Sequence, residues 1–243
     1  MPPVSADELF RAGKLEDAIE LLGVGLRSNP ADARQRAFLF ELLCFAGAHE
    51  RADKQLDVLA GASREAGLGA LLYRAALHAE RTRQEMFQKG SFPQGGPPPR
   101  SVAGTLNGRA FQELVDADPR IGARLEVFAA GQYLWMPLEH VATVRMAPPK
   151  KLRDLLWTPA VVRTGPGFHG LELGEVLLPA LAPLSWRHPD VAVRLGRVTE
   201  WTESEAEGTP VPVGQKLLLL DGEEFPFLEL RELDITPTAG SAG

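Results

Sequence analysis

The sequence predicts an α+β protein, with an N-terminal α-α superhelix of tetratricopeptide-like repeats followed by a mainly β C-terminal domain with short helices. Three observations lead to this class. Residues 1–90 are rich in Ala and Leu and have no proline after Pro30, a composition typical of helices. The rest of the chain holds all four tryptophans, 17 of the 20 prolines and many short Val/Leu runs, which is typical of strands and turns. Apolar positions in the first part recur after 34 residues, the tetratricopeptide period.

The composition limits the possible classes. At about 150 residues per domain, a chain of 243 residues is long enough for two small domains. A net charge of -6 and a pI near 5.5 argue against a nucleic-acid binder, since phosphate binding needs a concentrated Lys/Arg surface. No apolar run reaches the roughly 20 residues that cross a bilayer, so no membrane partner is expected. The single cysteine, Cys44, excludes an intrachain disulfide, and with an N-terminus lacking signal-peptide features it favours a cytoplasmic protein.

The first two helices have marked ends. Ser5 and Glu8 have the spacing of a capping box, in which each side chain accepts the backbone N–H of the other, and Gly13 ends this helix. A second helix is predicted from Leu15 to about Leu26, and Asn29–Pro30 stops it because proline cannot continue the backbone hydrogen bonds.

Adding 34 to positions in these helices reveals the repeat. Five pairs match: Leu9 and Leu43, Ala12 and Ala46, Gly13 and Gly47, Ala18 and Ala52, and Leu22 and Leu56. Small residues such as Ala18 and Ala52 allow two helices to pack closely, which is what a repeat of helix pairs requires. A degraded third copy predicts a long helix over residues 67–89 that caps the stack. An ordinary helical bundle is the alternative.

The chain therefore divides into a helical domain at 1–90, a Gly/Pro-rich linker or loop at 91–104, a mainly β domain at 105–236 and a disordered tail at 237–243. The elements predicted in the β domain are a hairpin around Gly131, a short helix at 152–156, strands at 174–179 and within 191–201, and a hairpin turning at Asp221–Gly222.

Aromatic and acidic residues in this part have two interpretations each. We expect Trp135, Trp157 and Trp201 to fill the core or lie half-buried, with an exposed partner platform as the alternative. The acidic stretch 200–207 is expected to be a solvated loop, with a docking face for a basic partner as the alternative.

Four stretches carry a resemblance to a known family. They are ADPRIGARLEVFAAGQYLWMPLEHV at 117–141, LRDLLWTPAVV at 152–162, GEVLLP at 174–179 and LGRVTEW at 195–201. In this order, with Asp-Pro-Arg, Tyr-x-Trp-x-Pro and Asp-Leu-Leu-Trp intact, they resemble the ImpE family, also called TagJ, and the helical N-terminal half extends the resemblance over most of the chain. The sequence departs from the family at 180–184, where an aromatic residue is expected.

The resemblance implies a non-enzymatic, cytoplasmic accessory protein of bacterial type VI secretion. Its implied partner is the contractile sheath, bound through an N-terminal helix of the small, TssB-like subunit, with an indirect link to the ClpV ATPase. From the repeat periodicity alone, a groove for such a helix would be lined by Arg34, Phe38, Glu41, Phe45 and Arg74. Packing in the helical core is the alternative for the two phenylalanines.

No catalytic, metal or cofactor site is expected. GPGFHG at 165–170 matches G-x-G-x-x-G but precedes a predicted strand, whereas a dinucleotide site needs a helix N-terminus there. Cys44 lies among apolar neighbours and is expected to be a buried, unreactive thiol. His169, His188 and Asp190 match no compact metal spacing. Two other functions stay open: a general tetratricopeptide scaffold or chaperone, and a hydrolase using those three residues.

Overall fold

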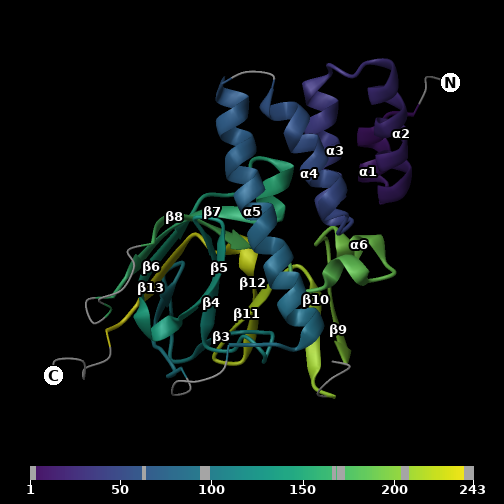
Figure 1. The fold of residues 1–243 in the computed structure, drawn as a ribbon. Coiled ribbons are helices and arrows are strands. Elements are labelled where there is room, and N and C mark those ends of the chain that lie inside the picture. Colours follow the sequence, from purple (N-terminus) through teal and green to yellow (C-terminus); the bar gives the residue numbers. More distant parts are fainter. Residues whose placement is uncertain are drawn as a thin grey trace.

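The computed structural model describes residues 4–61, 64–93, 99–165, 168, 173–203 and 208–237. Helices form the N-terminal part, and the remainder contains all the strands of the described residues (Figure 1). The helices are α1 (Ala6–Arg11), α2 (Leu15–Ser28), α3 (Ala33–Phe45), α4 (His49–Ala60), α5 (Arg64–Lys89) and α6 (Val191–Arg194). The strands are β1 (Gly104–Leu106), β2 (Arg109–Phe111), β3 (Leu114–Asp116), β4 (Arg124–Ala129), β5 (Gln132–Pro137), β6 (Val141–Met146), β7 (Trp157–Thr164), β8 (Gly174–Pro179), β9 (Thr199–Glu203), β10 (Pro210–Gly214), β11 (Leu217–Leu220), β12 (Glu223–Pro226) and β13 (Glu232–Ile235).

The predicted helix ends are confirmed. The Glu8 amide donates to Ser5 Oγ at 3.2 Å and the Ser5 amide donates to Glu8 Oε2 at 2.7 Å, which is the capping box that begins α1. Gly13 follows α1 with φ +73°, and Gly47 follows α3 with φ +67°, so both glycines adopt the left-handed conformation that other residues avoid. The long helix predicted at 67–89 is α5.

Consecutive helices pack on one another from α1 to α5. Figure 1 shows α5 as the link between the two parts, with its N-terminal half beside α4 and its C-terminal half crossing the front of the sheet. That second half packs against β4 and β5.

The strands form an eight-stranded sheet of order β2-β1-β13-β6-β7-β8-β4-β5, a three-stranded sheet of order β12-β11-β3, and the β9–β10 ribbon. Both predicted hairpins are present. β4 and β5 turn at Ala130–Gly131, and β11 and β12 turn at Asp221–Gly222, with positive φ at all four residues. A two-residue turn of this handedness matches the twist of the strands that it joins.

Two clusters of buried residues form the core. One fills the sheets and contains residues of the C-terminal part alone. The other fills the helices but also includes Phe128, Leu156, Trp157 and Leu195. The helices therefore share their core with the sheet side of the molecule.

Some predictions for the C-terminal part are wrong. Residues 191–194 form helix α6 instead of a strand, because Asp190 accepts the Ala192 amide at 2.8 Å and caps the first turn. The short helix predicted at 152–156 is confirmed, as a 3-10 helix over residues 152–155. Trp157 is a core residue, 2% exposed, but Trp201 is 44% exposed because β9 pairs with β10 alone among the described strands.

Parts of the predicted linker, acidic stretch and tail, at 94–98, 204–207 and 238–243, lie outside the described residues. At the end of the predicted linker, Val102 is buried and β1 begins at Gly104.

Candidate functional site

Three N-terminal helices and one segment of the C-terminal part enclose a groove of about 1210 Å³, which we call the helical groove. It is lined from α1 and its cap by Ser5, Ala6, Asp7, Phe10 and Arg11; from α2 by Leu21, Leu22, Val24 and Gly25; from α3 and its cap by Asp32, Arg34, Gln35, Ala37, Phe38 and Glu41; and by Lys150, Lys151, Leu152 and Arg153. The last four residues overlap the start of the LRDLLW motif, so the groove joins the two parts of the chain.

Aromatic and aliphatic side chains form the apolar lining of this groove. The rings of Phe10 and Phe38 meet edge to face with centroids 5.9 Å apart. On α2, Leu21 is 38% exposed and Val24 is 44% exposed, although both lie on a helix whose opposite face is in the core. Apolar side chains left open beside a groove are the feature that binds the apolar face of another helix.

A partly buried ion pair lies in one wall of the groove. Arg153 lies 3.3 Å from the carboxylate of Glu41 and stacks over the ring of Tyr73, 4.6 Å from its centroid. Burial raises the pKa of Glu41, and Arg153 partly opposes that shift. The turn that carries Arg153 is thereby attached to α3 and α5.

The structure brings together three of the five residues predicted to line a groove. Arg34, Phe38 and Glu41 lie there, on α3. Phe45 is only 1% exposed and packs in the core, and it does not line the helical groove. Arg74 does not line it either, because its guanidinium reaches Asp53 at 3.0 Å and Asp57 at 2.5 Å on α4.

Sequence reasoning does not predict that residues 150–153 line the groove. The repeat period could not reveal it, because Arg153 is 112 positions from Glu41 of α3 and 80 positions from Tyr73 of α5, which it contacts. The only signal in this segment is the LRDLLW motif, which by itself predicts a short helix and no binding role.

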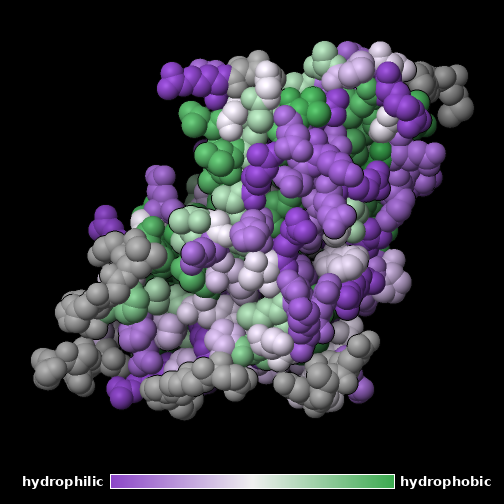
Figure 2. All heavy atoms as spheres, in the orientation of Figure 1, coloured by the Kyte–Doolittle hydropathy of each residue, from purple (hydrophilic) through white to green (hydrophobic). Residues whose placement is uncertain are grey.

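A second apolar surface lies away from the groove. Near the N-terminal end of α5, Leu68, Leu71 and Leu72 are 64%, 63% and 52% exposed. Figure 2 shows hydrophobic residues at the surface over this end of the helix. They do not line the helical groove, so substitutions there can serve as controls for substitutions in the groove.

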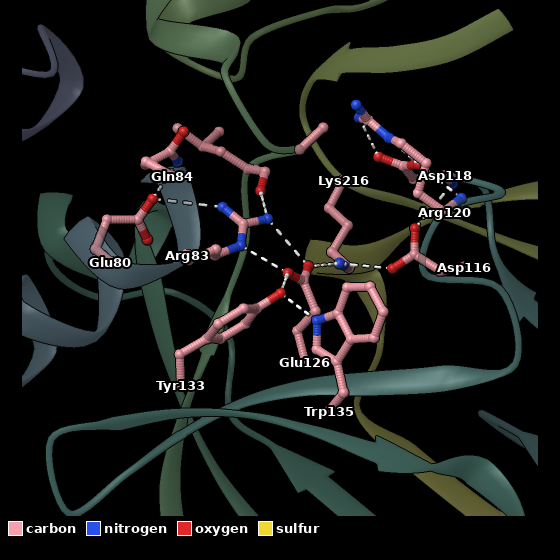
Figure 3. Close-up of polar contacts among 12 residues, drawn as sticks. Glu80, Arg83, Gln84, Asp116, Asp118, Arg120, Glu126, Tyr133, Trp135 and Lys216 are labelled. Atoms are coloured by element: carbon pink, nitrogen blue, oxygen red, sulfur yellow. Dashed lines mark hydrogen bonds and ion pairs between the residues drawn. The ribbon is translucent and has the colours of Figure 1, made fainter. Parts of the chain in front are cut away.

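A cluster of buried charges joins α5 to the sheet (Figure 3). Arg83 is 1% exposed and grips Glu126 of β4 with two hydrogen bonds, from Nε at 2.7 Å and from Nη2 at 3.0 Å. Its Nη2 also donates to the Leu181 carbonyl at 2.9 Å. Lys216 bridges Glu126 and Asp116, the latter at 2.6 Å. Tyr133 donates its hydroxyl proton to Glu126 as well.

Neighbouring polar groups extend this attachment. Trp157 Nε1 donates to Glu80 Oε2 at 3.1 Å, and Gln84 Oε1 accepts the Leu184 amide at 2.9 Å and Trp186 Nε1 at 3.3 Å. Glu80 and Gln84 belong to α5, whereas their partners come from the C-terminal part. Trp186 lies just beyond the segment where the sequence departs from the family.

The charges in this cluster compensate one another. Burial alone would raise the pKa of Glu126, but Arg83 and Lys216 hold that pKa at about 2. Burial and the nearby Glu126 raise the pKa of Asp116 to about 6, against the opposing effect of Lys216. With its charged groups paired to one another and buried, the cluster has the features of a structural joint.

The residues considered for chemistry have structural partners or lie outside the described part. His169 and most of GPGFHG are not described. His188 Nε2 lies 3.5 Å from Glu200, and Asp190 caps α6. Cys44 is buried as predicted, and burial raises its thiol pKa. Within the described residues, no three His, Cys, Asp or Glu side chains gather as metal ligands do, and no helix is long and apolar enough to cross a bilayer.

Known proteins are similar to this chain over most of its length. Residues 108–234 match the ImpE protein family. The type VI secretion system accessory component TagJ of Pseudomonas aeruginosa is 34% identical over 266 aligned positions, covering 96% of this chain and 92% of that protein. The X-ray crystal structure of protein VPA1032 from Vibrio parahaemolyticus has the same fold, with a TM-score of 0.82 at 23% identity, covering 95% of this chain and 97% of that chain.

Proposed function

The chain belongs to the ImpE protein family, and on that premise we propose that it is a non-enzymatic adaptor of a type VI secretion system. Its relative TagJ, which matches nearly the whole chain, is an accessory component of such a system. An adaptor works by binding other proteins of the apparatus, and we place it on the cytoplasmic side, where the sheath is.

The observation that carries this proposal is the helical groove. It has an apolar lining that includes Phe10 and Phe38, charged rims and a volume of about 1210 Å³. An amphipathic helix can bury its apolar face on such a lining while its polar flanks meet the rims. We propose that this helix is the N-terminal helix of the TssB-like small sheath subunit, and that ClpV is linked to the protein only through the sheath.

The helices that build the groove support a repeat interpretation. Gly13 and Gly47, 34 residues apart, end α1 and α3 in the same backbone conformation. We propose that α1–α2 and α3–α4 are two tetratricopeptide-like pairs of a domain at 1–90, with α5 as the cap, followed by a linker or loop at 91–104 and an ImpE-type β domain at 105–236.

The Arg83–Glu126 cluster supports a rigid adaptor. It attaches α5 to β4, and the Glu41–Arg153 ion pair attaches residues 150–153, which form one wall of the groove, to α3. A groove whose two walls are fixed in advance binds with less loss of conformational entropy than one that must first be ordered.

A peptide titration tests the proposal. The N-terminal helix of the small sheath subunit, as a synthetic peptide, is titrated into the full-length protein by isothermal calorimetry. We expect saturable one-to-one binding. Phe38→Glu should weaken it by about tenfold or more, because a carboxylate in the apolar lining loses its hydration on binding.

Leu72→Glu is the matched control, since it makes the same kind of change on the exposed surface of α5 outside the groove. It should leave the affinity unchanged. Absence of binding at high micromolar peptide contradicts sheath binding, and equal losses in the two variants contradict the groove. Specific capture of an unrelated protein from a lysate lacking sheath proteins would favour the general scaffold instead.

A further inference from the structure

We infer that the helical groove selects an amphipathic helix whose polar flank is acidic. This rests on the proposed function, because it specifies the chemistry of the segment that the same groove binds. The starting point is a contrast in charge. The groove is lined by five cationic and three anionic side chains, a surplus of two positive charges, whereas the whole chain carries a net charge of -6.

Each of the three anions already has an ion-pair or hydrogen-bond partner within the protein. Asp7 pairs with Arg11 at 2.9 Å. Asp32 caps α3, accepting the Gln35 amide at 2.9 Å and the Gln35 side-chain amide at 3.0 Å. Glu41 is 9% exposed and lies against Arg153. None of the three is therefore free to attract a basic partner.

Three cations are not used in this way. Arg34, Lys150 and Lys151 are exposed, and within the described part of the chain none of them has an ion-pair partner at 4.0 Å or less. Asp154 is close in sequence, but its carboxylate accepts the backbone amides of Lys150 and Lys151 at 2.8 and 2.9 Å and does not line the groove. These two hydrogen bonds fix the backbone that presents the lysines.

The apolar lining and these cations specify one kind of partner. Phe10, Phe38 and Leu152 would contact the apolar stripe of a helix, which has side chains at i, i+3, i+4 and i+7. The residues flanking that stripe would then meet Arg34 on α3 and the two lysines on the other wall. Carboxylates at those flanking positions are attracted, and a Lys-flanked helix is repelled, so the rim discriminates between partners more than it adds to affinity.

The test uses three synthetic peptides with the apolar stripe of the small-subunit helix and with Glu, Gln or Lys at the flanking positions. Each is titrated into the full-length protein at low salt and at 0.5 M NaCl. We expect the Glu peptide to bind about tenfold more tightly than the Gln peptide at low salt, with the Lys peptide weakest. The difference should shrink at high salt because exposed ion pairs are screened.

Reversing the charge of lining residues tests whether they cause the preference for the Glu peptide. Lys150→Glu/Lys151→Glu should abolish or invert the preference for the Glu peptide. Arg51→Glu/Lys54→Glu makes the same charge change at exposed positions of α4 outside the groove, and it should keep the preference. Because all four side chains are exposed, neither variant should alter folding, which urea unfolding checks.

The outcomes separate this inference from the proposed function. Equal binding of the three peptides, still lost in Phe38→Glu, overturns the acidic preference and leaves the groove proposal standing. No binding of any peptide overturns both. If the protein binds anionic phospholipid vesicles through Lys150 and Lys151 and shows no preference among the peptides, the rim recognises a membrane surface and the inference is wrong.

Discussion

Gly13 and Gly47 occupy the same position in the two helix pairs, yet alanine should have different effects at the two sites. Both glycines have positive φ, so a Cβ strains the backbone at either one. At Gly13 the nearest atom to an added Cβ is Arg197 Nη1, at 3.9 Å, which is an ordinary contact. At Gly47 an added Cβ would lie 2.6 Å from Trp186 Cε3 and 2.8 Å from Trp186 Cγ, which is too close for carbon atoms.

The expected losses follow from these distances. Gly13→Ala should lower the free energy of unfolding by about 1 kcal/mol, the backbone cost alone. Gly47→Ala should lower it by about 2–4 kcal/mol, because overpacking against the indole adds to the same backbone cost. Urea unfolding followed by circular dichroism measures both values.

Trp186 provides the decisive control. In a Trp186→Ala background the clash is absent, so adding Gly47→Ala should cost no more than Gly13→Ala does in the unmodified protein. The cost of Gly47→Ala in the unmodified protein minus its cost in the Trp186→Ala background is the coupling energy between Gly47 and Trp186. Equal losses for the two glycines in the unmodified protein, or a coupling energy near zero, would refute the packing of Trp186 over the turn after α3.

Three further predictions concern the buried groups. Arg83→Met should lower the free energy of unfolding by about 3–5 kcal/mol, since it leaves Glu126 buried with fewer partners. Arg74→Met breaks ion pairs that are exposed and should lower it by about 1 kcal/mol or less. Similar losses for the two variants in urea unfolding would contradict this difference in burial. The pKa of Glu126 is about 2 in the folded protein and 4.5 ordinarily. The stabilisation that its charge provides is therefore complete above pH 4.5 and is lost as the pH falls toward 2. From pH 5 to pH 3 the free energy of unfolding should decline less in Glu126→Gln than in the unmodified protein. Cys44 should react with a thiol reagent only in denaturant, and prompt labelling of the folded protein would contradict its burial.

Much of the local structure could be predicted from the sequence. The capping box at Ser5, the glycines after α1 and α3, and the hairpin turn at Asp221–Gly222 depend on backbone geometry within a few residues. Such signals depend only on residues that are close in the sequence, so they can be recognised without the tertiary structure. The strand predicted within 191–201 is present from Thr199 but wrong at 191–194, where the Asp190 cap outweighs the β preference of the valines.

The groove could be predicted only in part. Phe38 and Phe45 are seven residues apart on α3, so periodicity places them on one helix face. Their surroundings differ along the helix axis: Phe38 opens into the groove, whereas Phe45 lies at the end of α3 among Leu156, Trp157 and Leu181. The periodicity of one helix does not reveal which other elements pack against its two ends.

The sequence by itself determined the family, the order of helices before strands, and the turns, since these depend on motifs and on neighbouring residues. Only the tertiary structure decided that Arg83 is buried, because its partners Glu126 and the Leu181 carbonyl are 43 and 98 positions further along the chain. A charged residue in a helix is expected to face water, because burying an unpaired charge costs several kcal/mol, on the order of the whole stability of a domain. The fold compensates that cost with a carboxylate from β4, and the same packing of helices on the sheet brings Lys150 and Lys151 to the rim of the groove.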